Sequence, residues 1–107
     1  MSRYFILDGH ELIACGLMTG ARWCETADRH VRLTEQGDVM ISTVFLGLDH
    51  GWGEGDRPVV FETMVFQGEH GGEMERYCTW DEAEAGHAQW VAKVFKPTPI
   101  LALPEKA

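Results

Sequence analysis

The segment from Thr79 to Lys96 has the strongest helical signal in this chain. Thr79 and Glu82 fit a capping box, in which two side chains satisfy free backbone N–H groups at a helix start. Acidic residues follow at the positive end of the helix dipole, and Lys93 and Lys96 stand at its negative end. The apolar positions recur at helical spacing on one side: Ala83, His87, Trp90, Val91, Val94 and Phe95. The sequence therefore predicts a helix over 80–96 with one face that must be buried.

Several short runs rich in β-forming residues precede this helix. Two of them flank Asp8-Gly9, a two-residue signal for a hairpin turn. The runs from Asp38 to Leu48 and from Val59 to Phe66 carry apolar residues on both faces, as central strands do. The expected strands cover residues 4–7, 10–14, 30–34, 38–48, 59–66 and 74–80.

These elements predict an α+β fold of two layers. An antiparallel sheet of about five to six strands is expected, packed on one face by the helix 80–96 and by a short helix over 17–28. Residues 1–96 form a single domain in this interpretation. The C-terminal tail 97–107 contains three prolines and is expected to be extended.

The composition excludes several broad classes of protein. The chain has 107 residues, of which 45% are hydrophobic and 24% are charged, so it can bury a core and is not expected to be disordered. No apolar run approaches the ~20 residues that cross a bilayer. The first residues reach Asp8 after only four apolar positions, which is too few for a signal peptide. We expect a cytoplasmic protein without a membrane association.

Cysteine and histidine spacings give no signal for a cofactor. Cys15, Cys24 and Cys78 match neither a zinc-ligand pair nor a thioredoxin-like motif, so they are expected to be reduced and buried. The five histidines show no H-x₃-H or H-E-x-x-H spacing. No metal site and no cofactor are predicted.

The negative charge is concentrated in the middle of the chain. The net charge is −8, and residues 49–84 hold ten acidic residues against two arginines. Such a surface repels phosphate backbones and anionic lipids, which disfavours direct binding of nucleic acid or membranes. It suits a protein partner with a basic surface, although acidic residues also serve solubility alone.

A glycine-rich loop lies within this acidic region. Residues 47–58 contain four glycines and Trp52, which favours a hairpin connection or a binding loop with an exposed aromatic anchor. A phosphate loop is disfavoured, because the segment lacks lysine and leads into a strand. The predicted partner-binding residues are Asp49, His50, Trp52, Glu54, Asp56, Glu69 and Glu73.

Two further sites are open on the sequence alone. A small-ligand binder, such as a sponge for a nucleotide signal, would need a pocket between sheet and helix. Its lining would be Glu62, Arg76, Tyr77, Trp80, His87 and Trp90. Within that set, Glu62 is either a general base with a raised pKa or the partner of Arg76 or His87. An enzyme would need Glu62, His50 and His87 in one cleft.

Three ordered blocks carry a resemblance to known sequences. They are the stretches STVFLGLDH at residues 42–50, FETMVF at 61–66 and ERYxTWxEAxAGH at 75–87. In these blocks the chain resembles a group of small uncharacterised bacteriophage and prophage proteins. The resemblance implies an accessory protein that works in the cytoplasm of a bacterial host, and it implies no activity, cofactor or catalytic residue.

The resulting hypothesis is a non-enzymatic protein that binds a host or phage protein. Inhibition of a bacterial defence system, such as a CRISPR complex, is one form that this function takes. The small-ligand binder is the alternative, and the enzyme is a more distant one. A homodimer is compatible with each of these hypotheses.

Overall fold

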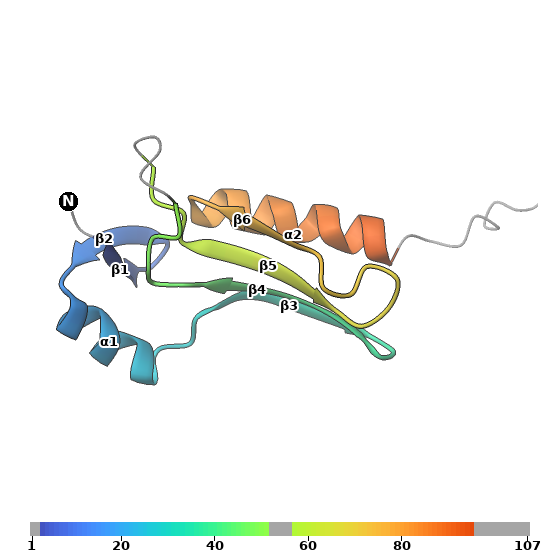
Figure 1. Cartoon of the computed structure of the whole chain (residues 1–107), viewed down its shortest axis with the longest axis horizontal. Coiled ribbons are helices and arrows are strands. Elements are labelled where there is room, and N and C mark those ends of the chain that lie inside the picture. The colour runs from blue at the N-terminus through green and yellow to red at the C-terminus, as the bar shows by residue number, and fades with distance from the viewer. Residues whose placement is uncertain (1–2, 52–56, 96–107) are drawn as a thin grey trace, which may run out of the picture.

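The computed structural model describes residues 3–51 and 57–95 (Figure 1). The elements follow the order β1 (Tyr4–Asp8), β2 (Glu11–Cys15), α1 (Leu17–Thr26), β3 (His30–Gln36), β4 (Val39–Phe45), β5 (Phe61–Phe66), β6 (Met74–Tyr77) and α2 (Trp80–Val94). The α+β class is confirmed. The strands divide between a two-stranded sheet, β1-β2, and a four-stranded sheet of order β3-β4-β5-β6, and all pairs are antiparallel. The predicted tail 97–107 lies outside the described residues.

The first hairpin forms where the sequence predicts it, with its turn displaced by one residue. Asp8 pairs with Glu11, so the two-residue loop is Gly9-His10, and Gly9 adopts a φ of +63° that suits glycine. The Phe5 amide donates to the Gly47 carbonyl at 2.9 Å, which ties the hairpin to the chain that follows β4. The short helix α1 packs against this hairpin, and Trp23 meets Phe45 edge-on.

The core of the four-stranded sheet lies on the face that α2 covers. Alternate residues of the two central strands point to this face and are fully buried. Figure 1 shows α2 lying along the same side of the sheet, and the described residues place no helix over the other side of its β5–β6 half. The buried set is Ile41, Thr43, Phe45, Phe61, Thr63 and Val65.

The start of α2 confirms the predicted cap, with one difference in its partner. The Glu82 amide donates to the Thr79 hydroxyl at 3.1 Å. The Glu82 carboxylate accepts in return from the Cys78 amide at 3.1 Å, one residue before the N-cap. The helix ends at Val94, two residues before the expected end, with Phe95 as its C-cap.

Gly86 allows α2 to approach the sheet closely. A Cβ atom at this position would overlap the ring of Tyr77, which points up from β6 beneath the helix. Glycine within a helix is ordinarily unfavourable by about 1 kcal/mol relative to alanine. Here the missing side chain makes room for the tyrosine ring and its polar contacts.

We therefore expect Gly86→Ala to destabilise the protein by roughly 1–3 kcal/mol, because overpacking outweighs the gain in helix propensity. Urea denaturation measures this change. Gly20→Ala in α1 is the matched control, since its Cβ would stand 3.4 Å from the Cys15 sulfur in ordinary contact. This control should be neutral or stabilising. Equal effects of the two substitutions would contradict the account of Gly86.

Candidate functional site

A continuous chain of hydrogen bonds lies between α2 and the sheet. His87, only 3% exposed, has Nε2 at 2.8 Å from the Thr34 hydroxyl and Nδ1 at 2.7 Å from the Thr43 hydroxyl. Thr43 is hydrogen-bonded to Thr63 on the neighbouring strand, and Thr63 lies 3.1 Å from the Tyr77 hydroxyl. The chain therefore crosses all four strands of the sheet from β3 to β6.

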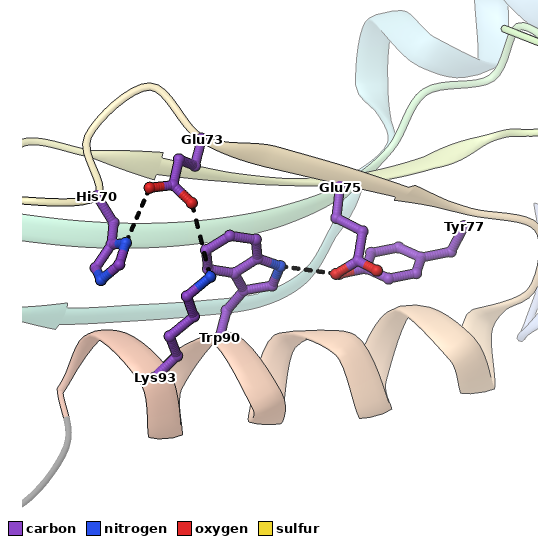
Figure 2. A network of polar contacts seen from close by, with 6 residues as sticks. All are labelled: His70, Glu73, Glu75, Tyr77, Trp90 and Lys93. Carbon is purple, nitrogen blue, oxygen red and sulfur yellow. Dashed lines mark hydrogen bonds and ion pairs between the residues drawn. The ribbon is translucent and has the colours of Figure 1, made fainter.

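The chain ends at a carboxylate on β6. Glu75 accepts from the Trp90 indole N–H at 2.9 Å, and its Oε1 atom lies 3.3 Å from the Tyr77 hydroxyl (Figure 2). The Tyr77 hydroxyl is placed to donate to Thr63 or to Glu75, and its single proton goes to one of them at a time. The network is satisfied when His87 is neutral, because one ring nitrogen then donates to a threonine hydroxyl and the other accepts from a second one.

Burial lowers the pKa of His87, and the charge of Arg32 lowers it further. A protonated ring would have to donate from both nitrogens, which reverses the direction of one of its two threonine bonds. Burial likewise raises the pKa of Tyr77, and its donation to Glu75 adds to this effect. The surroundings of His87 and Tyr77 therefore stabilise the uncharged forms of both side chains.

The structure separates the residues expected to line a ligand pocket. Tyr77, His87 and Trp90 meet beneath α2, where they fill the space between helix and sheet. Trp80 stacks on His10 with ring centroids 3.9 Å apart. Arg76 and Glu62 lie on the opposite face, joined by a 3.1 Å ion pair. The tyrosine and the arginine therefore do not line a common space.

The three residues proposed for an enzyme do not converge either. Glu62 and His87 lie on opposite faces of the sheet. The His50 ring is hydrogen-bonded to the Leu48 carbonyl in the segment after β4. Burial raises the pKa of the Cys78 thiol, which disfavours a reactive thiolate. All three cysteines are partly buried, and the described residues form no metal-binding group of three.

The predicted partner-binding residues fall at two ends of the sheet. Asp49 accepts from the Gly51 and Val59 amides at 2.8 and 2.9 Å, and these bonds lower its pKa. Through these two bonds Asp49, which precedes His50, joins Gly51 to Val59. Glu69 and Glu73 lie near the turn between β5 and β6, at the far end of β5. Trp52, Glu54 and Asp56 lie outside the described residues.

Of the eight described carboxylates of the acidic region, five lie on the helix-covered side, where exposed cations meet some of them. Glu73 contacts His70 and Lys93, Glu82 bonds Arg57 at 2.6 Å, and Glu84 faces Arg32 at 3.7 Å. We call this set the acidic α2 side: Glu73, Glu75, Asp81, Glu82 and Glu84.

Two grooves flank α2 within this acidic side. One, of about 540 Å³, runs between α2 and β3 and includes Arg32, Asp81 and Glu84 in its lining. The other, of about 180 Å³, is lined by Glu75, Gln89, Trp90 and Lys93. Lys93 also lies over the Trp90 ring, 4.6 Å from its centroid (Figure 2). The grooves place carboxylates beside apolar surface that is open to solvent.

Thr34, Thr43 and Thr63, which carry the centre of the network, were not among the predicted site residues. Thr43 and Thr63 stand between apolar residues on the inward side of their strands, but the sequence does not tell which side is inward.

Comparison with protein-family models, curated proteins and solved structures gave no match. No helix among residues 3–51 and 57–95 is long and apolar enough to cross a membrane.

The buried histidine predicts a specific dependence of stability on pH. The pKa of His87 is lower in the folded than in the unfolded state, so the unfolded state binds more protons as the pH falls through about 6.5. Stability contributed by His87 is therefore present above that pH and lost below it. Urea denaturation between pH 7.5 and 5.5 should show this loss.

Histidine NMR titration measures the same effect directly. The imidazole of His87 should titrate below 6.5, and Arg32→Gln should raise its pKa by removing a nearby positive charge. His87 titrating at or above 6.5 would contradict the network as described.

Proposed function

We propose that this protein acts without catalysis, by binding a protein partner that has a basic surface. The observation that supports this is the acidic α2 side, whose carboxylates line two grooves beside the helix. Its counter-cations are exposed, and exposed ion pairs contribute little and exchange readily with other charges. A partner's lysines and arginines can therefore take their place.

Asp81 and Glu84 are the favoured contact residues. They stand three positions apart on α2, so their side chains share one helix face, and both line the larger groove. Among the described residues of that lining, Arg32 is the one arginine or lysine. A basic side chain that enters the groove would meet two carboxylates and displace a weak 3.7 Å ion pair.

The proposed setting follows from the resemblance to bacteriophage proteins. In that setting the protein works in the cytoplasm of a bacterial host, and its partner is a host or phage protein. Nucleic-acid-binding proteins carry basic surfaces, so a component of a CRISPR complex is a fitting target. Occupying such a surface would block the nucleic acid that normally binds there, and the net charge of −8 disfavours direct binding to nucleic acid.

The test measures binding to purified bacterial nucleic-acid-binding proteins, a guide-free CRISPR effector among them. We expect binding that weakens with salt, and the variant Asp81→Asn/Glu84→Gln should bind roughly tenfold more weakly. The matched control is Glu11→Gln/Glu25→Gln, which removes the same charge from exposed positions of β2 and α1. Absence of binding to every protein of the panel, or equal weakening by both variants, would contradict the proposal.

A further inference from the structure

The face of the four-stranded sheet that α2 does not cover is unusually apolar. One row across it runs Leu33, Ser42, Met64 and Met74, which are directly paired on β3 to β6. Met40 and Phe66 pair in the adjacent row. An antiparallel sheet with one face in water ordinarily carries polar residues there. We call these six residues the bare sheet face.

Large apolar side chains are exposed on this face. Leu33 is 49%, Met74 45% and Phe66 40% exposed, although they belong to a well-paired sheet. Methionine and aromatic residues are enriched at protein interfaces, and methionine adapts its shape to a partner. Neighbouring exposed apolar side chains of this kind are typical of interaction surfaces.

The charge of this face indicates which kind of partner it can bind. Glu62 is neutralised by Arg76 at one end, and Glu35 stands beside Met40 at the other. The face is therefore nearly neutral in a chain whose net charge is −8. It does not complement a basic surface, but it does complement another apolar and nearly neutral face.

The area of the face matches what a modest dimer needs. The whole sheet face, which includes Glu62 and Arg76 next to the bare sheet face, has a projected area of roughly 400 Å² for four strands about 4.8 Å apart and about 20 Å long. Two such faces give about 800 Å², and side-chain relief brings the buried area to on the order of 1,000 Å², the lower bound for a specific interface.

Electrostatic repulsion does not oppose this contact. Sheets packed face to face lie about 10 Å apart, and the acidic α2 sides would point outward from both copies. The carboxylates of the two copies would then be separated by more than the Debye length of about 8 Å at physiological salt.

We propose that the bare sheet face binds the same face of a second copy of this chain, forming a two-fold homodimer with a sandwich of two four-stranded sheets. The contact buries Leu33, Phe66 and Met74 of both copies. It leaves both acidic α2 sides open, so the dimer offers two binding surfaces. This inference does not depend on the identity of the partner in the proposed function.

Sedimentation velocity of the full chain between about 5 and 500 μM tests the proposal. The wild-type chain should shift from the 12.0 kDa monomer towards twice that mass, with a dissociation constant in the micromolar range expected for a small interface. Leu33→Glu/Met74→Glu should weaken association at least tenfold, because it places four carboxylates in the interface. Both positions are exposed, so the variant should retain its circular dichroism spectrum.

Leu17→Glu/Met18→Glu is the matched control, since both residues are exposed on α1 and the charge change is equal. This variant should associate like the wild type. In a third experiment, Leu33→Glu/Met74→Glu is mixed with Leu33→Lys/Met74→Lys. The two variants should associate with each other, because opposite charges then meet across the interface, and neither variant should associate on its own.

Two results would overturn the homodimer. One is a wild-type chain that stays monomeric at 500 μM, including the case in which the chain's own tail covers the face. The other is unchanged association of Leu33→Glu/Met74→Glu, which would place the contact elsewhere, for example along the free edge of β3. If a monomeric chain still binds a basic partner, the homodimer is wrong but the proposed function stands. Failure of the homodimer can therefore be distinguished from failure of the proposed function.

Discussion

The hydrogen-bonded chain from Thr34 through His87 to Glu75 determines how this molecule is arranged. It joins α2 to all four strands of the larger sheet, and each of its polar groups would be costly to bury without its partner. Gly86 complements it by letting the helix lie directly on the Tyr77 ring. Because the network fixes α2 to one face of the sheet, this helix, the longest among the described residues, cannot cover the other face. The apolar side chains of the other face therefore remain exposed in the described part of the chain.

This arrangement also separates charge from apolar surface. Five of the eight described acidic residues of the middle region lie on α2, on the strand side that faces it or in the turn before β6, whereas Glu62 on the opposite face is neutralised by Arg76. The two surfaces suit two different kinds of contact, one electrostatic and sensitive to salt, the other hydrophobic and nearly neutral. A protein that dimerises through one and binds a basic partner through the other would present its acidic surface twice and gain avidity for a target with repeated sites.

The parts of the fold that depend on local signals could be predicted from the sequence. Thr79 and Glu82 identify the start of α2, and the alternation in Val39–Phe45 identifies a central strand. The partners of buried polar groups could not be predicted, because threonine favours a strand on either face and His87 reads as one more member of an apolar stripe. The apolar residues on both faces of β4 and β5 indicated central strands, in a sheet expected to be packed on one face. The described residues cover that face, and the exposed apolar side chains of the other face point to a second copy.

The accessibility of individual methionine methyl groups tests the central claim. This claim is that α2 covers one face of the sheet and that a second copy of the chain binds to the other face. NMR of the ¹³C-methyl-labelled chain with a soluble paramagnetic probe gives a separate reading for each residue. In dilute samples, Met64 and Met74 should be relaxed by the probe, and they should become protected as concentration rises. Met18, exposed on α1, should stay accessible throughout. If the accessibility of Met64 and Met74 to the probe does not change with protein concentration, the account is contradicted.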